Sequence, residues 1–168
     1  MLLFQAGRFT YQKNYDFTID VIKMLKNTNC KFRLFLAGDG MLEDKIREKV
    51  RRYNLDEKVV FLGVVENIDD YMCAADVFLL PSNHEGLGIV AIEAQYAGLR
   101  VLASDNVPYS AKISENIKFL PLDENIWVSE IGKNVLCNRD EKIECPEYSA
   151  VVQAERYSKI LCDFIDCE

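Results

Sequence analysis

A repeating alternation of short apolar runs and amphipathic helical segments is the feature that most constrains the fold. Six runs of three to six mostly apolar residues occur along residues 2–120, and a glycine, proline or serine follows each run. The segments between them place apolar side chains at the spacing of an amphipathic helix. Continuous apolar strands that alternate with helices are typical of a parallel sheet covered on both faces. The sequence therefore predicts an α/β domain built on a parallel sheet with helices on both faces.

The expected elements follow one another with short connections. Strands are expected over residues 2–6, 32–37, 59–62, 77–80, 101–103 and 117–120. Helices are expected over residues 15–26 with Asn14 as the N-cap, over 41–53 and 68–74, from Ile89 onward, over 125–136, and over about 146–165 with Pro146 in the first turn. Ligands of such sheets bind in the loops at the carboxyl ends of the strands. The unusual residues of those loops are therefore the candidate site.

Composition places the chain among globular proteins. Its 168 residues, 49% hydrophobic and 28% charged, fit a single domain over residues 1–168 with a sizeable core. No apolar run is long enough to span a bilayer, and the first four residues lack the basic region of a signal peptide. We therefore expect a cytoplasmic protein whose six cysteines, which form no CxxC pair, are reduced thiols.

Charge and histidine content argue against two kinds of partner. A net charge of −7 and a pI of about 4.9 argue against general binding to nucleic acid or to anionic membranes. His84 is the only histidine in the sequence, so a histidine-based metal site is not expected. An acidic domain can still bind a phosphorylated small molecule if its few cations are placed at one site.

The loop over residues 7–14 carries two cations, Arg8 and Lys13, just before a predicted helix. Lys13 taken alone is explained as a solvated surface lysine, although the helix dipole disfavours a cation at this position. Together with Arg8 it is better explained by an anion, such as a diphosphate, that lies between the two side chains. The loop over residues 38–40 resembles a phosphate-binding loop but lacks the third glycine of that motif, so a tight turn is expected there.

The stretch Glu85-Gly86-Leu87-Gly88 stands directly before the predicted helix that begins at Ile89. The backbone N–H groups of residues 86–89 are therefore expected to be free donors at the positive end of a helix dipole. Glycine at this position lets a ligand approach the backbone closely. Glu85 is explained equally well by interaction with the helix dipole and by a binding role.

Glu93 lies within that helix beside Ile92, Ala94 and Ala97, which predicts a helix buried nearly all round. A buried carboxylate is costly unless it is paired, so Glu93 needs hydrogen-bond donors. A ribose diol offers two hydroxyl groups to one carboxylate, and this favours a binding role. A structural salt bridge to Arg100 or to a lysine is the alternative.

Taken together, these stretches resemble a known family. The Glu85-x7-Glu93 spacing within PSNHEGLGIVAIEAQYAGLRVLASD, with GRFTYQKN, LAGDGMLEDKI and VVFLGVVENIDDYMCAADVFLLPS, closely resembles the C-terminal domain of family 4 retaining glycosyltransferases. The resemblance covers about residues 3–125 and is closest to bacterial transferases of capsular and exopolysaccharide synthesis. It implies a GT-B architecture, in which the C-terminal one of two Rossmann-like domains binds most of the nucleotide-sugar.

The resemblance also implies roles for individual residues. By position, Arg8 and Lys13 would hold the donor diphosphate, and Glu85 would contact the transferred sugar, so these three are the implied catalytic residues. Glu93 would bind the ribose hydroxyls. The remaining implied contacts are Gly7, Gly86, Leu87 and Gly88 in the donor site, and Val64 and Val65 facing the base.

The resemblance further implies the partners. The donor would be a nucleotide-diphosphate sugar, expected to be a UDP-sugar, with no metal or other cofactor. The acceptor would be a saccharide or lipid-linked saccharide held by an N-terminal domain outside these residues, in an enzyme working at the inner face of the membrane. Gly88 departs from the usual family pattern, which leaves the sugar open, and Arg100 replaces a frequent proline. A stand-alone nucleotide-binding or partner-docking module is the alternative interpretation, and a sugar-nucleotide epimerase fits the Glu85/Glu93 spacing less well.

Overall fold

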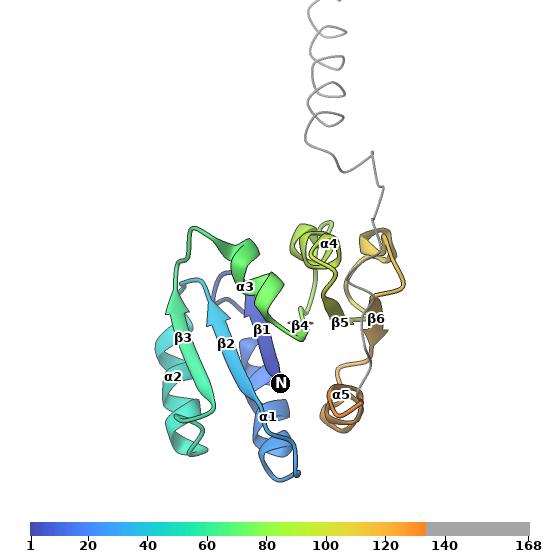
Figure 1. The fold of residues 1–168 in the computed structure, drawn as a ribbon. Helices are drawn as coiled ribbons and strands as arrows, with labels where there is room; N and C mark the ends of the chain where they lie inside the picture. Colours follow the sequence, from blue (N-terminus) through green and yellow to red (C-terminus); the bar gives the residue numbers. More distant parts are fainter. Residues whose placement is uncertain (134–168) are drawn as a thin grey trace, which may run out of the picture.

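The computed structural model describes residues 1–133, which form one six-stranded sheet with helices on both faces (Figure 1). All strand pairs are parallel, and the strand order is β3-β2-β1-β4-β5-β6. The strands are β1 (Leu2–Ala6), β2 (Arg33–Ala37), β3 (Val59–Gly63), β4 (Val77–Leu80), β5 (Arg100–Ser104) and β6 (Ile117–Leu120). The helices are α1 (Tyr15–Lys26), α2 (Glu43–Arg52), α3 (Ile68–Ala74), α4 (Ile89–Tyr96) and α5 (Glu124–Ile131), with a short 3₁₀ turn at Tyr109–Ala111.

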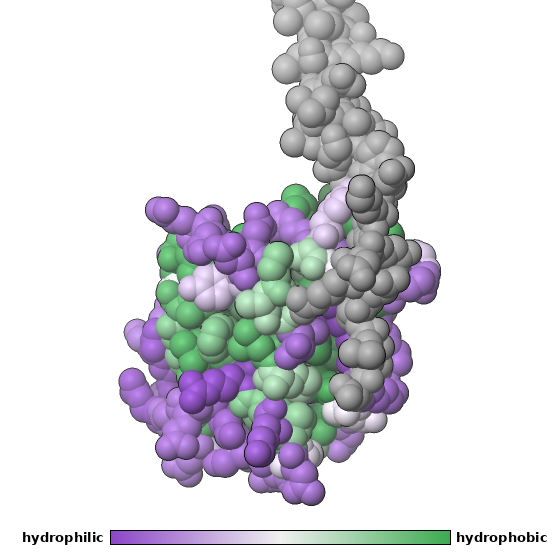
Figure 2. Space-filling model, in the orientation of Figure 1, coloured by the Kyte–Doolittle hydropathy of each residue, from purple (hydrophilic) through white to green (hydrophobic). Residues whose placement is uncertain are grey.

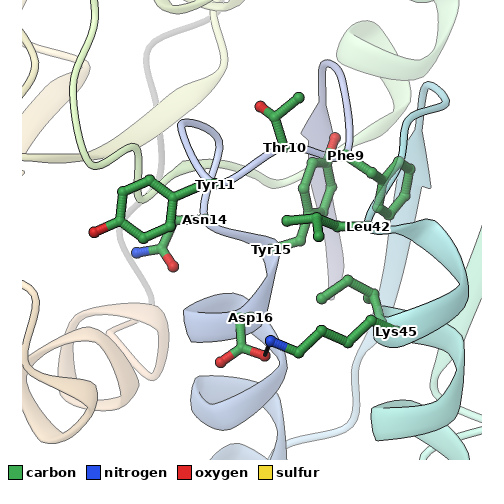
Figure 3. A pocket seen from close by; sticks show the side chains of 9 residues that line it. Phe9, Thr10, Tyr11, Asn14, Tyr15, Asp16, Leu42 and Lys45 are labelled. Carbon is green, nitrogen blue, oxygen red and sulfur yellow. Dashed lines mark ion pairs between the residues drawn. The ribbon is translucent and has the colours of Figure 1, made fainter.

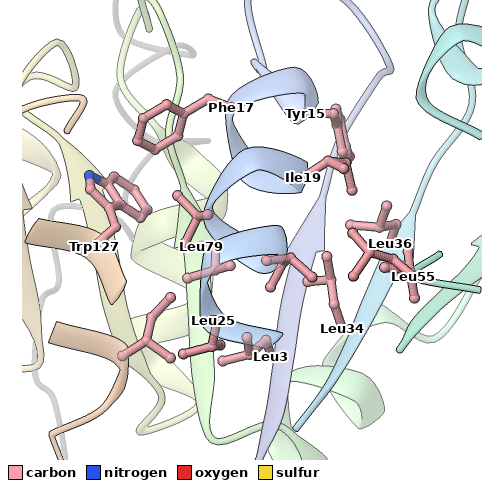
Figure 4. Close-up of a cluster of buried hydrophobic side chains, with 14 of the residues drawn as sticks. Leu3, Tyr15, Phe17, Ile19, Leu25, Leu34, Leu36, Leu55, Leu79 and Trp127 are labelled. Carbon is pink, nitrogen blue, oxygen red and sulfur yellow. The ribbon is translucent and has the colours of Figure 1, made fainter. Parts of the chain in front are cut away.

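Successive side chains of each strand point to opposite faces, so the sheet separates two hydrophobic clusters. Leu3 belongs to the cluster under α1, α2 and α5, whereas its neighbour Phe4 belongs to the cluster under α3 and α4. In the first cluster α1 packs against both α2 and α5, and Trp127 of α5 meets Phe17 of α1 edge-on at 5.4 Å between ring centroids (Figure 4). This double cover is the arrangement that the continuous apolar strands predicted.

The α3 side of the sheet is covered less completely. The α3 helix has only seven residues, and Phe35 of β2 and Leu62 of β3 stay partly exposed beside it. Figure 2, drawn from this side, shows hydrophobic surface near the centre of the face with hydrophilic side chains around it.

The expected elements are confirmed with small shifts at their ends. The predictions for residues 2–6, 15–26, 68–74, 77–80 and 117–120 match β1, α1, α3, β4 and β6 at both ends. The predicted helix over 41–53 begins two residues later, at Glu43, because the Glu43 N–H first closes a turn onto Gly40 O. The helix around Trp127 ends at Ile131 instead of reaching residue 136. The predicted helix over about 146–165 lies outside the described residues.

The prediction that Asn14 caps α1 is wrong in one respect. Asn14 does occupy the N-cap position, but its backbone is left-handed (φ 51°) and its side chain makes no capping hydrogen bond. The side-chain Nδ2 instead donates to Asn83 Oδ1 at 3.4 Å, in the loop after β4. The Asn14 side-chain amide, which the sequence predicted would cap α1, therefore joins two loops instead.

The strand order places a topological switch point between β1 and β4. From β1 the chain winds outward through β2 and β3, then returns to β4 and winds the other way through β5 and β6. Leu3 pairs with Val77 and Phe4 with Phe78 across the switch. The loops after β1 and β4 therefore open side by side at the carboxyl edge, which is where open α/β sheets bind ligands.

Candidate functional site

The loops after β1 and β4 are joined across the switch point by hydrogen bonds. The Asn83 N–H donates to Gln12 O at 2.8 Å, and Asn83 Nδ2 donates to Tyr11 O at 2.7 Å. Because both contacts use main-chain oxygens of the β1 loop, Asn83 fixes the path of that loop just before Lys13. The sequence alone does not single out Asn83, since nothing in the local pattern distinguishes it from any other loop asparagine.

Lys13 and Glu85 form an ion pair across the same junction. Lys13 Nζ lies 2.6 Å from Glu85 Oε1, and the two side chains are only 18% and 6% exposed. Ser82 Oγ donates to the same carboxylate oxygen at 2.6 Å, and Gln12 Nε2 approaches Oε2 at 3.4 Å. A carboxylate this deeply buried needs such partners, because an unpaired buried charge is strongly destabilising. Glu85, and not Glu93, is therefore the buried carboxylate of the site.

Two glycines explain how the β1 loop packs. A Cβ on Gly7, whose φ is +143°, would lie 3.1 Å from Lys13 Cε, so the lysine side chain runs along this glycine. A Cβ on Gly40 would lie 2.7 Å from Phe9 N, and Phe9 N donates to Asp39 O at 2.6 Å. The loop over residues 38–40 is thus a turn packed against the backbone of the β1 loop, as the sequence favoured.

An open depression of about 380 Å³ lies beside the ion pair at the start of α4. Gly88 is the N-cap of α4 with a left-handed backbone (φ +75°). Within residues 1–133, the backbone N–H groups of residues 86–90 donate no hydrogen bond, so the donors expected from the sequence are free. The residues that line the depression are Lys13, Glu85, Leu87, Gly88, Ile89, Val90 and Glu93.

The expectation that Glu93 is buried is wrong. Ile89, Glu93 and Tyr96, spaced i, i+4 and i+7, form an exposed face of α4, whereas Ala91, Ile92, Ala94 and Gln95 form its buried face. Apolar neighbours in sequence misled the prediction, because each step along a helix turns the side chain by about 100°. Pairing inside the core therefore does not explain why a carboxylate occupies position 93.

Glu93 also lacks the salt bridge offered as its structural alternative. Arg100 pairs instead with Glu130, at 3.3 Å between NH2 and Oε2, and no cation within residues 1–133 pairs with Glu93. Partial desolvation, with the negative charge of Asp69 on α3, raises the pKa of Glu93 above its ordinary value. An uncompensated carboxylate on the wall of a depression is open to a neutral hydrogen-bond donor.

Three other expected residues do not line the depression. Arg8 is exposed, and its side chain makes no hydrogen bond or ion pair with the described part of the chain. Val64 is 72% exposed at the end of β3, two strands away from β1, and Val65 is partly buried beside the core under α3 and α4. The described structure thus brings Lys13, Glu85 and Glu93 together, whereas Arg8, Val64 and Val65 are not part of the lining.

A second, smaller cavity of about 170 Å³ lies on the other side of the β1 loop (Figure 3). It opens between the first turns of α1 and α2, with Tyr11 and Asn14 on one side and Leu42 and Lys45 on the other. Its charges are balanced, because Asp16 is paired with Lys49 at 2.9 Å and with Lys45 at 4.0 Å. Sequence analysis gave no sign of this cavity, which depends on how α1 and α2 pack together.

The described residues show no metal centre and no membrane span. Between residues 1 and 133, no group of three histidine, cysteine or carboxylate side chains is placed to hold a metal ion. No helix in the same range is long and apolar enough to cross a membrane. The fold and the switch-point depression thus define the class of the protein: a Rossmann-like domain with a candidate ligand site at the carboxyl edge of its sheet.

The chain belongs to the group 1 glycosyl transferases, whose family model matches residues 1–120. It is 34% identical over 147 residues to EpsF, a Bacillus subtilis protein named as a glycosyltransferase, covering 84% of this chain and 38% of EpsF. It is 33% identical over 100 residues to the amylovoran biosynthesis glycosyltransferase AmsD of Erwinia amylovora, covering 60% of this chain and 28% of AmsD. The chain thus spans well under half the length of these relatives.

Solved structures show the same fold at low sequence identity. The lipopolysaccharide outer core galactosyltransferase WaaB superposes with a TM-score of 0.77 at 17% identity, over 96% of this chain and 49% of WaaB. The C-terminal domain of a group 1 glycosyl transferase from Francisella tularensis superposes with a TM-score of 0.69 at 19% identity, over 77% of this chain and 72% of that domain. Anabaena HepE, solved in complex with UDP, superposes with a TM-score of 0.67 at 22% identity, over 77% of this chain and 37% of HepE. The fold is therefore the C-terminal, Rossmann-like half of a GT-B glycosyltransferase.

Proposed function

We propose that this chain is the donor-binding domain of a family 4 retaining glycosyltransferase that uses a UDP-sugar in bacterial polysaccharide synthesis, of exopolysaccharide or capsule. One observation carries the proposal: Lys13, Glu85, Glu93 and the free N–H groups before α4 all border one depression at the switch point. This set joins donors for a diphosphate with acceptors for sugar hydroxyls. The UDP complex of HepE, which has the same fold, supports the choice of nucleotide.

The charges of the site suit a diphosphate without a tightly held metal ion. The free N–H groups of residues 86–90 lie at the positive end of the α4 dipole, where an anion is stabilised. Lys13 has three N–H donors and spends one on Glu85, so it can bind Glu85 and a phosphate oxygen together. Arg8 is exposed and carries no partner in the described structure, so its side chain is available to bind the diphosphate.

The remaining assignments combine the positions of groups around the depression with the family resemblance. Glu85 adjoins Lys13 just before α4 and accepts from the sugar. Glu93 lies about one turn into α4 and accepts from the ribose hydroxyls. The backbone of Gly86, Leu87 and Gly88 contacts the donor between them. By the resemblance, the backbone near Val64 and Val65, which follow β3, faces the base.

The proposed reaction exchanges one bond at the anomeric carbon of the donor. The bond from this carbon to the diphosphate oxygen breaks, and an acceptor hydroxyl oxygen bonds to the same carbon on the face that the leaving group vacates. Attack on that face retains the anomeric configuration. The acceptor proton passes to the departing diphosphate, so charge and atoms balance. Lys13, Arg8 and the free N–H groups offset the negative charge that grows on the diphosphate during this step.

The acceptor belongs to another part of the enzyme. We infer that a saccharide or lipid-linked saccharide is held by an N-terminal domain, and that the whole enzyme works in the cytoplasm at the inner face of the membrane. The relatives named above are long enough to contain such a domain, since this chain covers 38% of EpsF. The 168 residues alone should therefore bind the donor but transfer no sugar.

The proposal is tested by calorimetric titration of the 168-residue chain with UDP, GDP, ADP and uridine. UDP should bind, and uridine should bind far more weakly because it lacks the charges that the free N–H groups and Lys13 meet. Equal binding of UDP and uridine, or binding of neither, would overturn the proposal. A parallel incubation with UDP-sugars and saccharide acceptors should give no transfer, and measurable transfer would contradict the need for a second domain.

A further inference from the structure

Both the nitrogen and the oxygen of the Gln95 side-chain amide form hydrogen bonds. It lies on the buried face of α4 and is completely buried. Its Nε2 donates to Ala91 O at 2.9 Å and to Ala111 O at 2.8 Å. Its Oε1 accepts from Ile113 N, Ser114 N and Ser114 Oγ, each at 3.1 Å. All but one of these bonds leave α4 and hold the segment that follows β5.

The segment that Gln95 holds packs against the beginning of α4. A Cβ placed on Gly88, the left-handed N-cap of α4, would lie 3.1 Å from Val107 Cγ1 and 3.5 Å from Ala111 Cβ. Val107 and Ala111 therefore form a wall directly behind Gly88. Gly88 in turn lines the depression and belongs to the run of free N–H groups over residues 86–90.

We propose that Gln95 is a positioning residue for the donor diphosphate. By fixing residues 111–114, it keeps Val107 and Ala111 against Gly88 and holds the free N–H groups of the α4 start in one orientation. Gln95 itself does not line the depression. This inference rests on the proposed function, because it names the device that keeps those donors ordered before the ligand arrives. Donors that are already oriented need no reorganisation on binding.

Substitution of Gln95 by methionine isolates this role, because methionine preserves the length and apolar stem of the side chain. The variant removes the side-chain bonds from Gln95 to Ala111 O and Ser114 N, and a backbone group that loses its partner away from water favours a shift toward water. The segment over residues 107–114 should loosen, and Gly88 should lose its wall. The sequence alone does not single out Gln95, since one amide among apolar helix residues forms no recognisable pattern.

The matched control is Lys49→Met in α2. Lys49 is also buried and also joins two elements through polar bonds, to Asp20 Oδ2 at 2.6 Å and Asp16 Oδ2 at 2.9 Å, but it lies under the opposite face of the sheet. Both variants of the 168-residue chain should melt at lower temperature than the unmodified chain. Only Gln95→Met should weaken UDP, by about tenfold, the size of one charge-assisted hydrogen bond. Titration is done well below both melting temperatures.

A second readout follows the amides directly. Hydrogen exchange measured by NMR should speed up at Ile113 and Ser114 in Gln95→Met, and the Gly88 amide signal should shift, with neither change in Lys49→Met. If Gln95→Met does not fold, Ser114→Ala removes one of the same bonds at lower cost and should weaken UDP about two- to threefold. Variants that lose stability but bind UDP as the unmodified chain does would overturn the inference alone. An unmodified chain that does not bind UDP would overturn the proposed function and the inference together.

Discussion

Lys13 Nζ and Glu85 Oε1 lie 2.6 Å apart and join the loop after β1 to the loop after β4 at the switch point. Because both side chains are largely buried, an anion that enters the depression meets a neutralised pair and not a free lysine. In the proposed donor site, the free N–H groups before α4 and Arg8, which has no partner among residues 1–133, then supply much of the attraction. Each charge of the site can be tested separately on this basis.

Arg8→Ala tests the phosphate contact with little risk to folding, because Arg8 is exposed and has no partner among the described residues. We expect weaker UDP binding by about 1.5–3 kcal/mol, the value of a charge-assisted hydrogen bond, and unchanged binding of uridine. Calorimetric titration with both ligands measures the difference. Equal losses for UDP and uridine would show that Arg8 does not act on the phosphates.

Lys13→Met should weaken UDP in the same way and should also lower stability. Without Lys13, the Glu85 carboxylate, whose side chain is 6% exposed, loses its paired cation. Removing one partner of a buried ion pair lowers the free energy of unfolding by about 3–5 kcal/mol. Denaturant unfolding gives the stability, and titration of the folded protein gives the affinity. The double variant Lys13→Met/Glu85→Gln should recover much of the stability but not the UDP affinity; recovery of both would remove Lys13 from the donor site.

Glu85→Gln separates the sugar from the nucleotide. The amide still offers an acceptor to Ser82 Oγ but no longer neutralises Lys13, so UDP affinity should stay equal or increase. UDP-sugar should lose its advantage over UDP, because the carboxylate proposed to contact the sugar is gone. Paired titrations with UDP and a panel of UDP-sugars check this. A matching fall for UDP and UDP-sugar would make Glu85 a purely structural partner of Lys13.

Glu93→Gln should weaken UDP and UDP-sugar alike without lowering stability. The pKa of Glu93 is raised in the folded state by partial desolvation and by Asp69, so the folded state binds this proton more tightly. The stability that Glu93 contributes is therefore present at low pH and is lost as pH rises through the folded pKa. Glutamine does not ionise, so the variant does not lose this stability at neutral pH. The melting temperature at pH 7 should be equal or slightly higher.

The ribose assignment of Glu93 has its own control ligand. The loss of affinity in Glu93→Gln should be smaller for 2′-deoxy-UDP than for UDP, because one of the two hydroxyls is already absent. Titration of the variant and the unmodified chain with both nucleotides gives the comparison. Identical losses would place Glu93 away from the 2′-hydroxyl, and a large drop in melting temperature would make it a structural residue.

Glu130 gives a pH-dependent contribution to stability away from the site. It accepts from Lys118 at 2.8 Å, from Arg100 at 3.3 Å and from Lys133. Burial would raise the pKa of Glu130, but the hydrogen bonds from Lys118 and Lys133 outweigh it and hold the pKa below its ordinary 4.5. A depressed carboxyl pKa stabilises the folded state above the unfolded value, and this stability disappears as pH falls through the folded pKa.

Glu130→Gln should therefore destabilise the chain by about 3 kcal/mol at pH 7. The difference from the unmodified chain should shrink as pH falls below 4.5 and vanish below the folded pKa. Urea unfolding across this range, with tryptophan fluorescence of Trp127 on α5, follows it. A difference that does not change with pH would show that Glu130 contributes through packing and not through charge.

Local sequence was sufficient to predict most elements of this fold. The strand Leu2–Ala6 and the helix Tyr15–Lys26 appear with the predicted bounds, because apolar periodicity and the glycine that follows the strand are local signals. The same signals placed the candidate residues in loops at the carboxyl ends of strands. The resemblance of several ordered motifs then indicated the family, which no single loop could have done.

Tertiary structure decided which groups of the site are paired. Lys13 and Glu85 are 72 residues apart, and only the adjacency of β1 and β4 brings them into contact. The sequence assigned the buried carboxylate to Glu93, but packing of α4 on the sheet turned that side chain outward and buried Glu85 instead. Periodicity sets which residues can share a face, whereas the rotation of a helix and the order of strands depend on contacts between distant segments. Those contacts are made by packing in three dimensions, and the linear pattern does not contain them.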